Sequence, residues 1–433
     1  MKYFTDLIHN KSLLKVFIFS ATTKTISSFG LIFFNILIIK LINKETLGLI
    51  IIGLSLITFL SVFAKFGLNH ASLRFTSIFF DNYDSEKINE QIIQSFVISG
   101  FISLLISALI IIFEKEISLI IYKNAEIKGV LKIFALSLPF YTFIQIQKAI
   151  LKSFKLPALA HLADLGVILI MTCLMIVFLE FINFNITNYR ISLFFLISCI
   201  VVFSFINFIL FYISITKFIN FKFNKFKGFE NELIKTLPDY FSIDFVNYVV
   251  VWGSIFLCSF FLDSKTLASF SSTYWLAYVI LFFPLVLNSI FAPDFAINAF
   301  KNDKKVLNFK FNQNRNYSLI FSIPLFLLLF IFPNFFLEKI FNISAHEFDT
   351  ILRVLLLSAF LRVIFGPQVL FLNMSNQQNK VNRITIVSAM LHIAITIFSL
   401  IYLNLFFVAL SYLLTNFLKH IFLFFELKKV YRK

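Results

Sequence analysis

Apolar stretches of about twenty residues recur along the whole chain, and short polar segments separate them. An α-helix rises 1.5 Å per residue, so each stretch is long enough to cross about 30 Å of hydrocarbon. This pattern predicts an all-α polytopic membrane protein with about twelve transmembrane helices. The expected spans are 16–41, 46–68, 92–113, 130–150, 158–180, 191–216, 240–262, 266–290, 317–337, 350–372, 384–403 and 405–425.

A polar central segment divides these spans into two sets of six. We expect an N-terminal six-helix bundle over 1–216, a cytoplasmic basic linker over 217–239 and a C-terminal six-helix bundle over 240–433. Short matches recur between the halves at an offset near 220 residues, as between Lys44-Glu-Thr-Leu47 and Ser264-Lys-Thr-Leu267. Such a duplication of six spans predicts bundles related by a pseudo-two-fold axis along the membrane normal, with a substrate site between them.

Composition and charge agree with a membrane protein. The chain is 59% hydrophobic and 14% charged, whereas soluble domains average about 45–50% and about 25%. Its net charge of +16 does not require a nucleic acid partner, because about 25 of the Lys and Arg residues flank the spans on one side. By the positive-inside rule that side, with both termini, is cytoplasmic.

Several kinds of chemistry have no signature in the sequence. Cys173, Cys199 and Cys258 all lie within apolar spans, which gives no disulfide framework, and no Cys/His spacing fits a zinc site. There is no phosphate-binding Walker loop and no dinucleotide fingerprint. We therefore expect a protein that is not an enzyme and that carries no metal or cofactor.

The first span contains an unusual polar stretch, SATTKTISSFG, with Lys24 at its centre. A charge in the middle of a span costs about 2.5–3.5 kcal/mol, so it tends to face a wet cavity or a partner. Helical geometry separates this polar face from the face that carries Phe19, Ile26 and Phe33. Either the stripe lines a cavity, or Lys24 snorkels and the hydroxyls pack against another helix. The side chains that share the face of Lys24 are Ser20, Ser27, Ser28 and Asn35.

Three further basic residues are candidates. Arg362 lies about twelve residues into the tenth span, close to the middle of the membrane, and is expected to face the cavity. Lys65 and Arg74 flank the cytoplasmic end of the second span. They serve either at the entrance of a cavity or as ordinary cytoplasmic anchors.

Acidic candidates follow from the repeat. Adding 220 to Lys24 gives Asp244, and adding 220 to Arg74 gives Asp294. We therefore predict that Lys24 and Asp244 face each other from opposite bundles. Asp164 at the start of the fifth span either caps that helix, pairs with Lys152 or Lys155, or acts as a coupling carboxylate.

Four motifs follow one another along the chain. They are Leu41-Ile-Asn-Lys-Glu-Thr-Leu-Gly48, Phe66-Gly-Leu-Asn-His-Ala-Ser-Leu-Arg74, Asn288-Ser-Ile-Phe-Ala-Pro-Asp294 and Gly366-Pro-Gln-Val-Leu-Phe-Leu-Asn-Met374. Their order and spacing resemble the polysaccharide flippases of the multidrug/oligosaccharidyl-lipid/polysaccharide (MOP) exporter superfamily. This resemblance implies two bundles around a MATE-like V-shaped cavity, in the bacterial inner membrane. It also implies a cargo of undecaprenyl-diphosphate-linked oligosaccharide, as for O-antigen, lipopolysaccharide or capsule.

On this hypothesis the candidate residues divide into two groups. Lys24, Arg362, Lys65 and Arg74 bind the diphosphate, and Ser20, Ser27, Ser28 and Asn35 bond to sugar hydroxyls. Asp244, Asp164 and Asp294 serve as counter-ions or couple transport to H+ or Na+. The expected partners are the lipid-linked oligosaccharide, the bilayer, and a polymerase with other polysaccharide-assembly proteins.

Two alternatives remain. An ion-coupled exporter of cationic drugs has the same fold, but it favours a cavity dominated by carboxylates, whereas the deep charges here are mostly positive. A membrane enzyme of polysaccharide assembly, such as a polymerase, is expected to carry a large outer loop, and the longest outer loops here are short.

Overall fold

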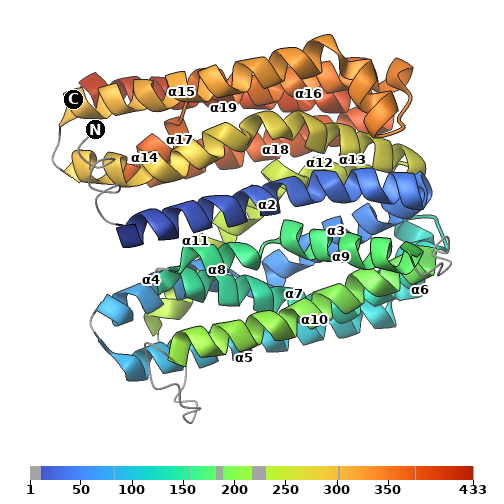
Figure 1. The fold of residues 1–433 in the computed structure, drawn as a ribbon, viewed down its shortest axis with the longest axis horizontal. Helices are drawn as coiled ribbons and strands as arrows, with labels where there is room; N and C mark the ends of the chain where they lie inside the picture. The colour runs from blue at the N-terminus through green and yellow to red at the C-terminus, as the bar shows by residue number, and fades with distance from the viewer. Residues whose placement is uncertain are drawn as a thin grey trace. The chain divides into compact units, whose positions relative to one another are not determined.

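Helices joined by short turns make up the described part of the chain in the computed structural model (Figure 1). Ten helices among the described residues are long and apolar enough to cross a membrane. The predicted class of all-α polytopic membrane protein is confirmed. The chain folds into two compact units, residues 1–248 and 249–433. The structure describes residues 11–81, 83–154, 156–181, 189–216, 231–300, 303–375 and 377–432.

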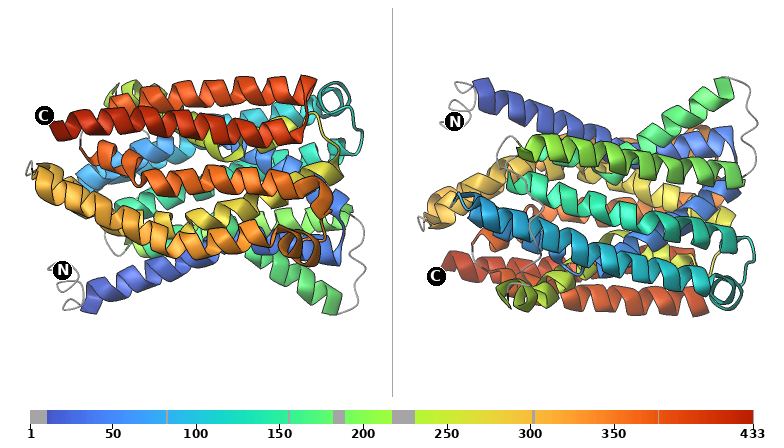
Figure 2. Two further views of the ribbon diagram at one scale, coloured as in Figure 1. Left: turned by 90° about the horizontal axis from the view of Figure 1, so that it is seen from above. Right: turned by 90° about the horizontal axis from the view of Figure 1, so that it is seen from below.

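In the first unit, α7 is the central helix, because it packs against α3, α4, α5 and α10. Figure 2 shows α5, α7 and α10 running side by side. Gly53 of α3 allows one of these contacts, since a Cβ atom there would overlap the ring of Phe134 on α7. The helices of this unit are α2 (Lys11–Leu41), α3 (Lys44–Lys65), α4 (Leu68–Asp81), α5 (Ser85–Ile112), α6 (Glu114–Glu116), η1 (Ile117–Ile121), α7 (Ile127–Ser153), α8 (Pro157–Leu162), α9 (Leu165–Phe181), α10 (Tyr189–Thr216) and α11 (Asn231–Tyr248).

The backbones of α2 and α9 touch at a pair of glycines. A Cβ atom at Gly30 would overlap the carbonyl of Gly166, and a Cβ atom at Gly166 would overlap the carbonyl of Ser27. Small residues allow this close approach, which provides van der Waals contact where lipid gives no hydrophobic driving force between helices. The contact fixes the face of α2 that carries Lys24.

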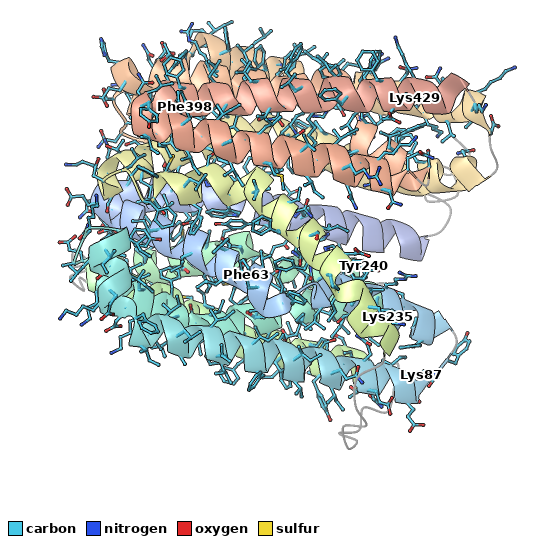
Figure 3. The ribbon with its side chains drawn as sticks, turned by 180° about the vertical axis from the view of Figure 1, so that it is seen from behind. Phe63, Lys87, Lys235, Tyr240, Phe398 and Lys429 are labelled. Atoms are coloured by element: carbon cyan, nitrogen blue, oxygen red, sulfur yellow. The ribbon has the colours of Figure 1, made fainter. Side chains whose placement is uncertain are left out.

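The helix α11 belongs to the first unit, where it packs against α3 and α4. Aromatic rings form much of this contact: Phe241 lies 5.4 Å from Phe63 and 4.9 Å from Phe66, centroid to centroid. Figure 3 shows Phe63 on α3 beside the helix that carries Tyr240. The second unit begins at Val249, whereas the sequence placed the start of the second bundle at residue 240. Most of the predicted linker, 217–230, lies outside the described residues.

In the second unit, α19 packs against α16, α17 and α18. A core of aromatic and aliphatic side chains, including Phe295, Phe311 and Phe371, joins α14, α15, α17 and α19. The helices are η2 (Val249–Gly253), α12 (Ser254–Cys258), α13 (Ser264–Tyr278), η3 (Val279–Leu281), α14 (Phe282–Phe300), α15 (Lys304–Ile331), η4 (Phe335–Ile340), α16 (Ala345–Phe365), α17 (Gln368–Met374), α18 (Gln378–Tyr402) and α19 (Leu405–Arg432).

Several of the predicted spans differ from the helices observed, and two of these contain the candidate residues Asp164 and Arg362. The span expected over 158–180 is broken into α8 and α9 by a turn at Ala163 and Asp164. The span expected over 350–372 ends early, because Gly366 has a φ of 73° and terminates α16. Neither α9 nor α16 is among the ten helices that satisfy the membrane-span criterion in the described residues.

Candidate functional site

Asp164 is the centre of an ion-pair cluster in the first unit. It lies buried at the break between α8 and α9. Its carboxylate pairs with Lys24 of α2 at 3.1 Å, with Lys148 of α7, and with Nδ1 of His161 at 3.3 Å. The sequence offered a cap of the following helix or an ion pair with Lys152 or Lys155. The ion pair forms instead with Lys148, one turn before Lys152, and Lys155 lies outside the described residues.

Local structure explains how these side chains meet. The break between α8 and α9 turns the Asp164 carboxylate toward α7, and His161 lies one helical turn earlier at i−3. The glycine contact between Gly30 and Gly166 brings α2 against α9, which places Lys24 beside Asp164. The Lys24 side chain nevertheless keeps 41% of its surface exposed.

Asp244 is the centre of a second cluster, also in the first unit. Its carboxylate lies 3.7 Å from Lys65, 3.0 Å from Nε2 of His70 and 3.2 Å from the amide of Asn69. The turn between α3 and α4 at Phe66 and Gly67 has positive φ values of 44° and 80°. This turn lets both the end of α3 and the start of α4 present side chains to α11.

The predicted opposition of Lys24 and Asp244 from separate bundles was wrong. Both residues belong to the first unit, and Asp244 pairs with Lys65 and His70 while Asp164 pairs with Lys24. The offset between the repeats gave no sign that α11 packs against the helices that precede it. Hydropathy identifies a membrane helix but does not identify its neighbours.

Electrostatics connect the two clusters, because Lys148 and Lys65 are close enough to influence each other. We refer to Lys24, Lys65, Lys148, Asp164 and Asp244 as the basic cluster. Its three lysines outnumber its two carboxylates, and Lys152 adds a further positive charge that acts on Lys24, Lys148 and Asp164. The cluster therefore carries an excess of positive charge inside the helices of one unit.

Arg74 lies at the edge of this region rather than within it. The guanidinium is exposed, and its Nη1 donates a hydrogen bond to the hydroxyl of Tyr240 at 3.2 Å. The Tyr240 ring in turn stacks on His70, with centroids 5.7 Å apart. The sequence grouped Lys65 with Arg74, but the structure buries Lys65 and leaves Arg74 accessible.

The polar stripe of α2 faces the protein. Ser27 and Asn35 are buried, whereas Phe19, Ile26 and Phe33 each expose about half of their surface. The backbone of Ser27 lies at the glycine contact with α9. The side chains of Ser20, Ser28 and Asp294, also predicted as site residues, lie outside the described part of the structure.

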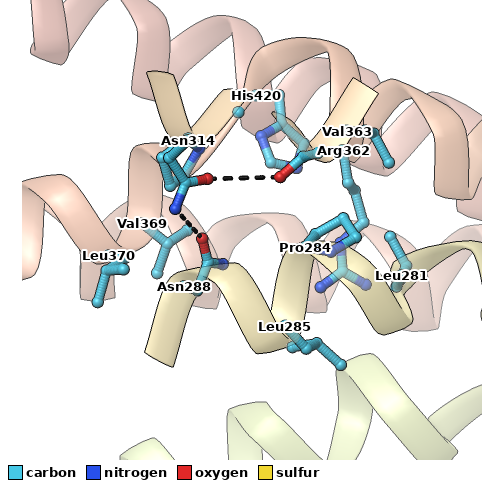
Figure 4. A pocket seen from close by; sticks show the side chains of 13 residues that line it. Leu281, Pro284, Leu285, Asn288, Asn314, Arg362, Val363, Val369, Leu370 and His420 are labelled. Atoms are coloured by element: carbon cyan, nitrogen blue, oxygen red, sulfur yellow. Dashed lines mark hydrogen bonds between the residues drawn. The ribbon is translucent and has the colours of Figure 1, made fainter. Parts of the chain in front are cut away.

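Arg362 faces a small cavity in the second unit (Figure 4). Its Nη1 donates a hydrogen bond to the hydroxyl of Tyr278 at 3.0 Å, and the guanidinium lies 5.6 Å from the centre of that ring. The cavity has a volume of about 90 Å³. It is lined by Leu281, Pro284, Leu285, Asn288, Asn314, Ser318, Arg362, Val363, Gly366, Pro367, Val369, Leu370 and His420.

Sequence reasoning missed several polar residues in these sites. It singled out neither Lys148, His70 and Asn69 in the first unit nor Asn288, Asn314 and His420 in the second. A signal was present for His420, because an imidazole in an apolar span requires a polar partner. The Nε2 atom of His392 on α18, which is also buried, lies 2.7 Å from the hydroxyl of Ser254 on α12.

Comparison with known proteins identifies the family. The profile of a family described as polysaccharide biosynthesis protein matches residues 37–343. The chain belongs to this family. No curated protein sequence matches it.

Solved structures show the fold of this chain. The lipid II flippase MurJ in an inward closed conformation is 17% identical, with a TM-score of 0.73 over 96% of this chain and 89% of that chain. An inward-facing multidrug resistance MATE family transporter of the MOP superfamily is 11% identical, with a TM-score of 0.70 over 95% and 96%. A MOP superfamily transporter from Pyrococcus furiosus is 10% identical, with a TM-score of 0.64 over 96% of each chain. The chain therefore has the MOP superfamily fold.

Proposed function

We propose that this protein is a flippase that translocates undecaprenyl-diphosphate-linked oligosaccharide repeat units across the bacterial inner membrane by alternating access. The observation that carries the proposal is the basic cluster, where lysines outnumber carboxylates inside the helices of the first unit. Membership of a polysaccharide biosynthesis family supports a glycan cargo.

The cluster suits a diphosphate for an electrostatic reason. A diphosphate that crosses hydrocarbon loses its water and counter-ions, and fixed ammonium groups replace them. Before cargo binds, Asp164 holds Lys24 and Lys148, and Asp244 holds Lys65. The cargo phosphates compete with these carboxylates for the lysines. A carboxylate released in this way is then free to bind H+ or Na+, which would couple transport to an ion gradient.

The other parts of the cargo have suitable surroundings. The lipid tail remains in the bilayer while the diphosphate occupies the protein. Arg74 and Tyr240 offer accessible donors to sugar hydroxyls close to Lys65. A polymerase and other polysaccharide-assembly proteins use the translocated repeat unit.

A charge-removing variant tests the proposal. We expect Lys148→Gln to lower the translocation of a fluorescent undecaprenyl-diphosphate-linked sugar in proteoliposomes by about ten- to a hundredfold, because a hydrogen bond to a charged group contributes about 1.5–3 kcal/mol. Lys115→Gln is the matched control, since Lys115 is exposed on α6, outside the basic cluster. Equal translocation by both variants, at equal protein levels, would exclude the basic cluster as the diphosphate site.

The same vesicles test the drug-export alternative. Asp164 and Asp244 are each paired with a lysine. An organic cation at either position would therefore meet a carboxylate that already has a basic partner. We expect no transport of a cationic dye under a proton or sodium gradient. Uptake of the dye without translocation of the lipid-linked sugar would favour a drug exporter.

A further inference from the structure

The cavity around Arg362 in the second unit presents mainly hydrogen-bond donors. A chain of hydrogen bonds fixes the orientation of its amides: Ser318 donates to Oδ1 of Asn314 at 3.4 Å, and Nδ2 of Asn314 donates to Oδ1 of Asn288 at 3.3 Å. Because both of these carbonyl oxygens already accept a hydrogen bond, Nδ2 of Asn288 is left as a donor. Arg362 adds the guanidinium nitrogens that do not bind Tyr278.

Positive charge in this region has no acidic counterpart among the described residues. Lys419 and Arg362 are close enough to interact electrostatically, and neither forms an ion pair with a described carboxylate. None of the residues that line the cavity is Asp or Glu. α15 contributes another cation at the edge, because the Arg315 side chain contacts Gly366. Uncompensated cations are costly within a membrane protein, so an anionic ligand is the expected counter-ion.

His420 gives the cavity a titratable group. Its Nδ1 lies 2.9 Å from Oε1 of Gln368, an oxygen that only accepts, so Nδ1 is the protonated nitrogen. Its Nε2 is then a donor only when the ring takes up a second proton. The ring stacks on Phe365 of α16. The charged groups that act on it are Arg362 from α16 and Lys419 from α19, and because both are cations they oppose a second proton on the ring.

We propose that this cavity binds an oxyanion of the size of phosphate, together with a proton that Nε2 of His420 takes up from solvent. The volume of about 90 Å³ leaves room for one tetrahedral oxyanion. An anion in the cavity attracts a proton to His420, and the protonated ring adds a third donor for the anion. The two binding events therefore reinforce each other, and the linkage is reciprocal.

The ligand chemistry is a phosphate group, whether from the cargo, a phospholipid headgroup or free phosphate. The inference deepens the role proposed for Arg362 as a cargo-binding cation and rests on that proposal. It adds that anion binding in the second unit depends on pH through one identified residue. The basic cluster of the first unit takes no part in it.

Calorimetric titration of the purified full-length protein with sulfate tests this proposal. Sulfate has the shape of phosphate and keeps one charge state between pH 5 and pH 7, so any pH dependence comes from the protein. We expect affinity about tenfold higher at pH 5 than at pH 7, and proton uptake when buffers with different ionisation heats are compared. Sodium chloride keeps the ionic strength constant.

Four variants locate the effect. Arg362→Gln should abolish sulfate binding, and His420→Gln should leave weaker binding that no longer depends on pH and takes up no proton. Asn288→Leu should weaken sulfate binding while the pH dependence remains. This variant still tests the cavity as the binding site if His420→Gln fails to fold. Arg353→Gln is the control, because Arg353 shares α16 but pairs with Asp349 outside the cavity. Sulfate affinity that is equal at both pH values, or that survives Arg362→Gln, would overturn the proposal.

Competition identifies the source of the phosphate. Displacement of sulfate by undecaprenyl diphosphate supports the site as a cargo contact, and displacement by phosphatidylglycerol vesicles supports it as a headgroup site. Displacement by inorganic phosphate alone supports a site for the free anion. Sugar translocation without sulfate binding would reject only this inference, whereas sulfate binding without sugar translocation would reject only the proposed function.

Discussion

Asp244 shows how much depends on a single buried charge. It is 9% exposed, and its carboxylate contacts Lys65 of α3 and both His70 and Asn69 of α4. Taking two charges out of water is costly, and their attraction repays this cost only when both are present. Removing one partner is therefore more damaging than removing both.

A paired substitution tests this point. We expect Asp244→Ala to lower the free energy of unfolding by about 3–5 kcal/mol, because Lys65 is left buried without its carboxylate. The double variant Asp244→Ala with Lys65→Met should recover much of that loss. Denaturant unfolding of the purified protein measures both values. A double variant that is no more stable than Asp244→Ala would show that Lys65 is not the residue left unpaired.

Among the elements, α2 and α9 depend on each other through glycine. Gly30 and Gly166 let the two backbones touch, and this contact sets the position of Lys24 relative to Asp164. A larger residue at either position would separate the helices and break the ion pair. The geometry of the basic cluster is thus a consequence of helix packing as well as of charge.

Gly166→Val tests this dependence. The added side chain overlaps the carbonyl of Ser27, and overpacking of this kind costs about 1–3 kcal/mol. We expect lower thermal stability together with a loss of translocation similar to that of Lys148→Gln. Gly129→Val is a useful comparison, since a Cβ atom at Gly129 meets nothing within 4 Å. Wild-type activity in Gly166→Val would mean that the contact does not position Lys24.

At the scale of the whole molecule, the distribution of basic residues predicts the orientation in the membrane. Polar segments that contain most of the Lys and Arg alternate along the chain with segments that contain few, so the positive-inside rule assigns them to opposite sides. The helical architecture agrees with a multi-pass membrane protein, with ten helices suited to spanning in the described residues. The orientation of the chain has to be measured with the protein in its membrane.

Reporter fusions provide that test. We expect a fusion after Lys225 to report the cytoplasmic side and a fusion after Asn342 to report the opposite side. Fusions at both termini should match the one after Lys225. A cytoplasmic signal from the fusion after Asn342 would contradict the predicted topology.

The sequence by itself determined the class of fold, the positions of most membrane helices and the presence of charges within them. These features depend on the length and composition of local segments, because every backbone polar group in a bilayer must bond within its own helix. The polar and apolar faces of α2 also followed from helical periodicity: Ser27 is buried, and Ile26 is exposed. The local sequence is sufficient for each of these properties.

Only the tertiary structure decided which charges meet. The repeat predicted that Lys24 lies opposite Asp244. In the folded chain Lys24 pairs with Asp164, and Asp244 pairs with Lys65. Lipid tails are as apolar as leucine, so hydrophobicity does not select the neighbours of a membrane helix. Close contacts select them, such as Gly30 against Gly166 and the rings of Phe63 and Phe241. Those contacts join segments far apart in the chain, and no local pattern records them.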